Sequence, residues 1–429
     1  MSSRDPASRI VITGSGAICG AGKSPAEIVD AALAGRSAIA EITLFDASTW
    51  PRRYAAEVTD YDAGKLTGDR KLLKLVRRAD VFGLYAAAQA IGQAGFARHR
   101  ETLDEDANVA FGEATGCYVG SGGGAFNVNY DYFPLMAQAG GDLHAFGRDL
   151  PSNVNPMWLL RTLPNNVLCH VGIRHALKGP NACITNHTTS GLLAVIEGAE
   201  AIREGEAERI VAAGHDAPVE PQLILYYHRC GVVAERVIKP FDASRDGSVL
   251  GEGAAALVLE TEASARVRDA TILGEYLGGG VASEGLGLLA LGEEGEGPAR
   301  AIEAALENAG LSAKDVGMIV AHANGTQQSD ASEAAGLRTV FGNAMPPVTG
   351  FKWSTGHPLA ASGILDLTLG LEAARRRIVP GIATLQTLDR ACAGVTASAS
   401  AQVPRSDVVL VVCRGFGSTN AAVLLRAAA

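Results

Sequence analysis

The sequence predicts an α/β protein built from two related halves. Hydrophobic residues make up 47% of the 429 positions and charged residues only 19%, a composition suited to large buried cores. The 51 glycines, with only 5% aromatic residues, favour tight turns between strands and helices. Predicted helices over residues 86–96 and 302–311 end in QAGF and NAGL, and each leads to a strand and glycines. We interpret this similarity as an internal repeat.

The first half opens with a short β-branched strand, residues 9–13, and a glycine-rich turn. A helix follows, with Ser24 as its N-cap and Pro25 in its first turn. Residues 117–124 are strand-like and end in glycines, and residues 252–260 form an apolar run typical of a buried strand.

The sequence becomes polar after residue 260, so we place the boundary there and expect two halves, residues 1–260 and 261–429. In the second half, residues 318–325 are strand-like. The glycine-rich stretch over residues 278–297 is the best candidate for a long surface loop.

The net charge of −9 argues against a nucleic-acid-binding protein, which needs clustered basic residues. An acidic protein can still carry a local basic patch. One basic run at helical spacing consists of Arg70, Lys71, Lys74, Arg77 and Arg78. It fits a cationic face for phosphate or for an acidic carrier protein, and it fits an ordinary solvated helix face equally well.

Seven scattered cysteines without CxxC spacing indicate neither a zinc site nor a disulfide framework. They are typical of reduced core residues in a cytoplasmic protein. We find no signal peptide and no apolar run long enough to span a membrane, so we expect a cytoplasmic protein without membrane contact.

The segment over residues 179–191, GPNACITNHTTSG, predicts a strand that turns sharply into a helix. The helix buries one face, because apolar residues recur at helical spacing, and it ends at Gly205. A side chain at the turn lies at the positive end of the helix, where free N–H groups stabilise negative charge. The residues suit a nucleophile, and they suit a helix cap equally well.

Two further segments place histidines at the ends of strands. VAHANGTQQSDASE carries His322 at the end of an apolar run, with Asp330 and Glu333 on the helix that follows. KWSTGHPLAASG places Lys352 and His357 in a glycine-bounded turn. Such imidazoles can donate hydrogen bonds to a carbonyl oxygen or a departing carboxylate, and Lys352 can pair with Glu333 to hold them.

A glycine-rich turn, GFGSTN, follows the last apolar strand but one. We expect the backbone N–H groups around Gly415 and Gly417 to complete an oxyanion site.

Together these segments resemble the β-ketoacyl-ACP synthases over essentially the whole chain, in the right order. The matching pieces are VGSGGG, GPNACITNHTTSG, KPFDASRDGSVLGEGAAALVLE, VAHANGT, KWSTGH and GFGSTN. The resemblance implies a thiolase-like duplicated fold with five alternating αβαβα layers. It implies thioester substrates on the phosphopantetheine of an acyl carrier protein, with no cofactor or metal of the chain's own. It also implies a homodimer, or a heterodimer with a cysteine-bearing ketosynthase.

The resemblance also assigns roles to individual residues. His322 and His357 fall on the family's paired catalytic histidines and Lys352 on its lysine. Glu333 falls on the acidic partner of that lysine, and Phe416 on the gating residue.

The sequence departs from the family at Thr188, which falls where the family has its nucleophilic cysteine, and at His187, where a small residue is usual. Cys183 lies within the incoming strand and does not replace the thiol. An alcohol is much harder to ionise than a thiol and needs a positioned base. Asn324 replaces a threonine that contacts pantetheine in the family, whereas Thr326 is retained.

We therefore expect a protein of fatty-acid or polyketide biosynthesis that binds malonyl-ACP and decarboxylates it, with condensation impaired or altered. One alternative is a Thr188 acyl-enzyme with His187 or His357 as base, active in condensation or acyl transfer. Another is a non-catalytic partner subunit comparable to a chain-length factor. A dehydrogenase is disfavoured, because RIVITGSGAICG is a weak match to a dinucleotide-binding turn and no acidic residue stands clearly at the end of a second strand to hold a ribose. A metal site at the histidines is disfavoured by their spacing.

Overall fold

The computed structural model describes residues 9–122 and 126–428. Its largest feature is a ten-stranded sheet with the order β10-β9-β11-β12-β8-β1-β7-β6-β4-β5. The first-half strands are β1 (Ile10–Cys19), β4 (Thr115–Ser121), β5 (Asn181–Ile184), β6 (Arg209–Asp216) and β7 (Gly253–Thr261). The second-half strands are β8 (Gly274–Ser283), β9 (Met318–Val320), β10 (Val348–Thr349), β11 (Val408–Gly415) and β12 (Thr419–Ala427). A separate pair is formed by β2 (Ile39–Glu41) and β3 (Tyr54–Ala56).

The two halves of the sheet repeat one pattern of strand directions. In the first half, β1, β7 and β6 are antiparallel in turn, and β6, β4 and β5 are parallel. In the second half, β8, β12 and β11 are antiparallel, and β11, β9 and β10 are parallel. A short antiparallel contact between β1 and β8 joins the halves. The internal repeat predicted from the helix endings is therefore present as a repeat of topology.

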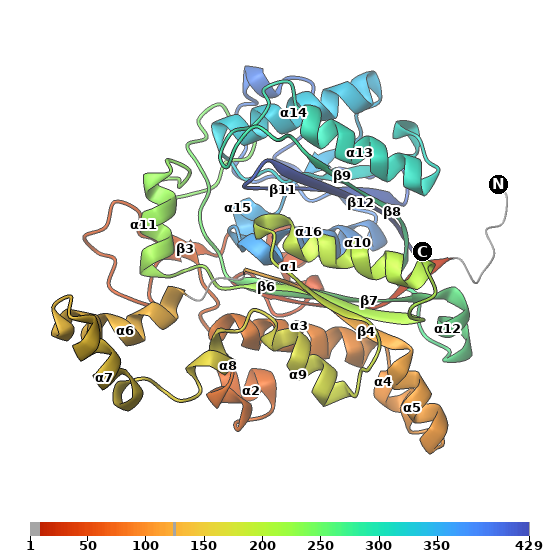
Figure 1. The fold of residues 1–429 in the computed structure, drawn as a ribbon. Helices are drawn as coiled ribbons and strands as arrows, with labels where there is room; N and C mark the ends of the chain where they lie inside the picture. The colour runs from red at the N-terminus through yellow and green to blue at the C-terminus, as the bar shows by residue number, and fades with distance from the viewer. Residues whose placement is uncertain (1–8, 123–125, 429) are drawn as a thin grey trace.

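Helices and sheet halves alternate in five layers, αβαβα, as the resemblance implies (Figure 1). One outer layer holds α3 (Arg78–Gln93) and α9 (Asn166–His175), and the other holds α13 (Glu296–Ala309) and α14 (Gln327–Phe341). The central layer consists of α10 (Ser190–Arg203) and α16 (Ser362–Arg375), which lie between the two halves of the sheet. Nearly every residue of these two central helices is buried, which is the expected pattern for helices covered on all sides.

Shorter helices complete the described chain. They are α1 (Pro25–Leu33), α2 (Ala63–Thr67), α4 (Phe96–Arg100), α5 (Glu105–Glu113), α6 (Phe126–Ala139), α7 (Leu143–Asn153), α8 (Trp158–Thr162), α11 (Pro221–Arg229), α12 (Glu262–Val267) and α15 (Lys352–Thr355). Single 3₁₀ turns include η2 (Leu72–Lys74), η3 (His187–Thr189), η4 (Ala313–Asp315), η5 (Gly342–Ala344), η6 (Leu359–Ala361) and η7 (Arg390–Cys392).

Most local predictions match the structure. The Ser24 side chain caps α1 by accepting a hydrogen bond from the N–H of Glu27. The predicted boundary at residue 260 lies at the end of β7. Part of the predicted strand over residues 117–124 lies outside the described residues.

The predicted long loop over residues 278–297 is too long, because β8 continues to Ser283 and α13 begins at Glu296. The glycines at 278 and 280 let β8 pack directly on α13: a Cβ at Gly280 would lie 2.2 Å from the carbonyl oxygen of Ala301. These glycines therefore serve a close strand–helix contact and not a loop. Over the described part of the chain, no helix is both long and apolar enough to cross a membrane.

Candidate functional site

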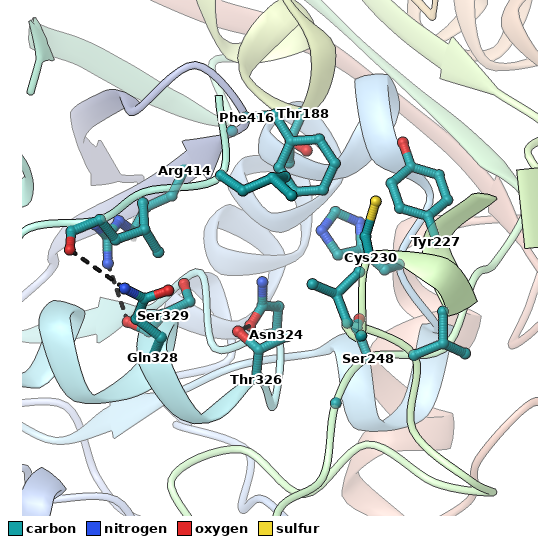
Figure 2. A pocket seen from close by; sticks show the side chains of 18 of the residues that line it. Thr188, Tyr227, Cys230, Ser248, Asn324, Thr326, Gln328, Ser329, Arg414 and Phe416 are labelled. Atoms are coloured by element: carbon teal, nitrogen blue, oxygen red, sulfur yellow. Dashed lines mark hydrogen bonds between the residues drawn. The ribbon is translucent and has the colours of Figure 1, made fainter. Parts of the chain in front are cut away.

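A cavity of about 470 Å³ lies where the two halves of the molecule meet (Figure 2). The first half contributes the turn between β5 and α10, together with α11. The second half contributes the segments that follow β9 and α15, and the end of β11. The structure thus brings Thr188, His322, His357 and Phe416 to one cavity, although they are spread over more than half of the chain.

Thr188 lies in the 3₁₀ turn η3, directly before α10, and is 2% exposed. The Ser190 hydroxyl fixes this turn by accepting from the N–H of Asn186 at 2.7 Å and donating to the carbonyl of His187 at 2.7 Å. A Cβ at Gly415 would lie 3.5 Å from the nitrogen of Thr188, so β11 ends against the turn. The predicted strand-to-helix turn therefore exists, with Thr188 near the helix N-terminus.

His187 points toward the cavity and contacts three of its residues. Its Nδ1 lies 2.9 Å from Thr188 Oγ1, and its Nε2 lies 2.6 Å from Tyr227 Oη. Its ring stacks on Phe416, with centroids 4.6 Å apart and planes at 14°. Burial lowers the pKa of His187 to about 4, so its ring is neutral at neutral pH.

His322 and His357 face each other with ring centroids 5.3 Å apart. The N–H of Leu359 donates to His357 Nδ1 at 3.2 Å, so the neutral ring carries its hydrogen on Nε2. Burial lowers the pKa of both rings well below 6.5, and the nearby Lys352 ammonium lowers it further. The site therefore holds two neutral imidazoles, which can donate hydrogen bonds without carrying a proton charge.

The predicted pairing of Lys352 with Glu333 is wrong. Lys352 Nζ donates to Asp366 Oδ2 at 2.5 Å, and both side chains are buried. The Glu333 carboxylate instead accepts hydrogen bonds from the backbone N–H groups of His322 and Ala323, at 2.7 and 2.9 Å. Glu333 thus holds the backbone that carries His322. Neither Lys352 nor Glu333 is among the described residues that line the cavity.

Backbone strain is concentrated around the cavity. Among the eight described non-glycine residues with positive φ, His187, Ala323, Leu359 and Ser418 belong to the site segments. Their φ values lie between 34° and 59°. Such conformations cost free energy and persist where the surrounding structure holds them, commonly at functional sites.

Of the four residues predicted to bind substrate, three are among the described residues that line the cavity, and Gly417 is not. Asn324 and Thr326 both line it, and Asn324 Oδ1 accepts from the N–H and the hydroxyl of Thr326 (Figure 2). Gly415 also lines it. The expected role for the N–H of Gly417 does not fit, because this N–H donates to the carbonyl of Leu288 at 2.8 Å.

Three lining or supporting residues were missed from the sequence: Tyr227 on α11, Asp366 on α16, and Cys230, which lines the cavity. Tyr227 and Asp366 lie within helices and Cys230 caps the end of α11, and only the fold brings them near the histidines. Cys183 is half-buried on β5, and burial raises the pKa of its thiol to about 11. Among the described residues, no three His, Cys, Asp or Glu side chains are grouped so that they could hold a metal ion.

Comparison with known families identifies the chain. A model of the β-ketoacyl synthase N-terminal domain matches residues 7–265, and a model of the β-ketoacyl synthase C-terminal domain matches residues 273–386. The chain belongs to the β-ketoacyl synthase family. The resemblance inferred from the motifs is confirmed.

Relatives match this β-ketoacyl synthase over nearly the whole length of both chains. It is 30% identical to 3-oxoacyl-[acyl-carrier-protein] synthase 2 of Coxiella burnetii, over 97% of this chain and 98% of the relative. It is 31% identical to the granaticin polyketide putative β-ketoacyl synthase 1 of Streptomyces violaceoruber, over 97% and 98%.

Solved structures of ketosynthases share its fold. The ishigamide ketosynthase/chain length factor superposes with a TM-score of 0.87 at 27% identity, covering 98% of this chain and 99% of that one. A β-ketoacyl synthase from Burkholderia phymatum gives 0.86 at 26% identity, over 98% and 100%. The fold is therefore α/β and thiolase-like.

Proposed function

We propose that this protein binds a malonyl group, carried as a thioester on the phosphopantetheine of an acyl carrier protein, and decarboxylates it in fatty-acid or polyketide biosynthesis. The observation that carries the proposal is the pair of neutral, buried imidazoles of His322 and His357 at one cavity. The names of the relatives, a 3-oxoacyl-[acyl-carrier-protein] synthase and a polyketide β-ketoacyl synthase, support the carrier-protein substrate and the two kinds of pathway.

The chemistry needs hydrogen-bond donors and no covalent intermediate. His357 Nε2–H and a donor on His322 bind the thioester carbonyl oxygen of the malonyl group. The bond between the α-carbon and the carboxylate breaks, its electron pair forms the enolate, and carbon dioxide leaves. The two donors stabilise the enolate oxygen, and the α-carbon then takes a proton, giving an acetyl thioester. Donors that are oriented before the reaction stabilise this charge most effectively.

The cavity also offers polar groups for the amides of a pantetheine arm. Asn324 Oδ1 is occupied by Thr326, which leaves the amide nitrogen of Asn324 free to donate toward a substrate. Thr326 and Ser248 add hydroxyl groups on the same side of the cavity (Figure 2). The phosphopantetheine belongs to the substrate, and we propose no cofactor or metal of the protein's own.

Part of the basic run over residues 70–78 is available to bind an acidic carrier protein. Arg77 pairs with Asp80 and Arg78 pairs with Glu252, so these two arginines hold the fold. Arg70, Lys71 and Lys74 are exposed and offer a cationic surface to an acidic carrier protein.

A second subunit is supported by exposed apolar side chains on α6, α7 and α8 and the segments beside them. They are Phe133, Met136, Leu143, Met157, Trp158, Leu159, Leu160 and Leu163. The three helices lie near one another, because α6 packs against α7 and Tyr132 of α6 contacts Trp158 of α8. Large exposed apolar patches mark protein interfaces. The partner is a second copy of this chain or a cysteine-bearing ketosynthase. The likeness to the ishigamide ketosynthase/chain length factor supports the pairing with a ketosynthase. In that pairing this chain is a non-catalytic subunit comparable to a chain-length factor, and it is inactive by itself.

The proposal is tested by measuring carbon dioxide release from malonyl-ACP in single-turnover reactions. We expect His322→Ala and His357→Ala each to slow release about 100- to 1,000-fold, because each removes one donor to the enolate oxygen. His144→Ala is the matched control, because His144 is exposed on α7 and does not line the cavity. Unchanged release in His322→Ala would rule the proposal out.

A further inference from the structure

Thr188, His187 and Tyr227 form a continuous hydrogen-bonded row at the edge of the cavity. Thr188 Oγ1 lies 2.9 Å from His187 Nδ1, and His187 Nε2 lies 2.6 Å from Tyr227 Oη. The decarboxylation described above uses none of these three groups. A hydroxyl bonded to an imidazole that a third group orients is the arrangement that activates weak oxygen nucleophiles.

The surroundings of His187 fix its ring in this position. Its backbone is held in the left-handed region, at φ 50°, and its side chain lines the cavity. One face of the ring stacks on Phe416, and Tyr227 is buried at 5% exposure. A ring held on three sides keeps Nδ1 directed at Thr188 Oγ1.

The protonation state of the row is suited to proton transfer. The imidazole is neutral at neutral pH because burial lowers its pKa. When Nε2 carries the hydrogen and donates to Tyr227 Oη, Nδ1 has a free lone pair for the Thr188 proton. The opposite tautomer would donate to Thr188 and could not accept its proton.

We propose that Thr188 is an acyl-accepting nucleophile, that His187 is its base, and that Tyr227 is a positioning residue for His187. The substrate class is an acyl thioester on a carrier protein. Decarboxylation requires only His322 and His357, so acylation of Thr188 is a separate activity of the same cavity.

The step balances without any further reactant. Thr188 Oγ1 attacks the thioester carbonyl carbon while its proton moves to His187 Nδ1. The C–S bond then breaks, the phosphopantetheine sulfur leaves with its electron pair, and His187 returns the proton to it. The products are an oxygen ester at Thr188 and a free thiol on the carrier. The N-terminus of α10, directly after Thr188, stabilises negative charge that develops during the attack.

An oxygen ester is less reactive toward carbon nucleophiles than a thioester, so we expect acylated Thr188 to accumulate. The test is incubation of the full-length protein with octanoyl-loaded acyl carrier protein, followed by intact mass and peptide mapping. We expect one octanoyl group on the peptide containing Thr188. We expect it to resist neutral hydroxylamine, which cleaves thioesters on cysteine readily.

Substitutions separate the three roles. Thr188→Ala should abolish the adduct and Thr188→Ser should retain it, with thermal unfolding showing that both variants are folded. His187→Gln keeps a polar side chain but lacks a basic nitrogen, and should slow acylation about 100-fold or more.

Tyr227→Phe tests positioning, because it keeps the ring but removes Oη. We expect slower acylation together with a change in the ¹⁵N spectrum of histidine-labelled protein, from one tautomer of His187 to a mixture. A purely structural role for Tyr227 would leave the His187 tautomer unchanged.

Three results would overturn the proposal: no adduct on the wild-type chain, an adduct mapped to a cysteine such as Cys230, or equal acylation rates in wild type and His187→Gln. Release of carbon dioxide from malonyl-ACP is measured separately and does not depend on Thr188. Failure of this inference is therefore distinguishable from failure of the proposed decarboxylation.

Discussion

At the scale of single residues, Lys352 and Asp366 form a buried ion pair close to His322. Both side chains are nearly inaccessible, at 1% and 2% exposure, so each charge depends on the other. The ammonium also helps to keep His322 neutral. We interpret the pair as a means of holding a positive charge beneath the histidines without exposing it to substrate.

Removing one member of this pair should destabilise the protein strongly. We expect Lys352→Met and Asp366→Leu each to lower the free energy of unfolding by about 3–5 kcal/mol, because an unpaired buried charge remains. The double variant should recover most of the loss, since no charge is left unpaired. Urea unfolding of the three variants measures this directly. Additive losses in the double variant would show that the two side chains are not coupled.

Individual site residues were predictable to different degrees. His322, His357 and Thr188 lie in glycine-flanked turns at the ends of predicted strands, so the sequence marks them. Tyr227 and Asp366 lie within ordinary helices, and nothing near them in the sequence indicates a site. The pairing of Lys352 with Glu333 was predicted wrongly, because the true partner of each is set by packing between layers.

At the scale of elements, the site depends on a very close contact between β4 and α10. A Cβ at Gly120 would lie 2.3 Å from the nitrogen of Gly191, so glycine is required there. This contact fixes how closely the N-terminus of α10 approaches β4, and therefore the position of Thr188. Sequence periodicity predicted the strand and the helix, but the distance between them follows only from the folded structure.

Gly120→Ala should therefore destabilise the protein by about 1–3 kcal/mol, because the backbone of α10 must move away from β4. Gly92→Ala is the matched control. It lies in α3 with no atom within 4 Å of the added Cβ, and should stabilise the fold by about 0.5–1 kcal/mol. Thermal unfolding of the two variants provides the measurement. Equal stability of both variants would contradict the close contact.

At the scale of the whole molecule, the duplicated topology places the cavity between the halves. The repeated helix endings predicted the duplication, and the structure shows it as the same order of strands in each half. The exposed apolar side chains of α6 to α8 were not predicted, because the sequence of residues 133–163 does not distinguish apolar side chains that are exposed from those that are buried.

We predict that this surface holds a second subunit. Leu159→Glu places a charge on α8, where Leu159 is 53% exposed, and should shift the protein toward monomers in sedimentation equilibrium. Val267→Glu, on the distant α12, should leave the association unchanged (Figure 1). The prediction would be contradicted if the wild-type protein remained a monomer both alone and when mixed with a cysteine-bearing ketosynthase.

Decarboxylation depends on His322 and His357, and intact mass spectrometry of the carrier protein tests this dependence most directly. Purified protein is incubated with malonyl-ACP alone, in parallel with the His322→Ala/His357→Ala double variant. We expect the wild-type protein to convert malonyl-ACP to acetyl-ACP, with loss of the mass of carbon dioxide, and the double variant to leave malonyl-ACP unchanged. Malonyl-ACP that remains unchanged with wild-type protein, or equal conversion by both proteins, would contradict it.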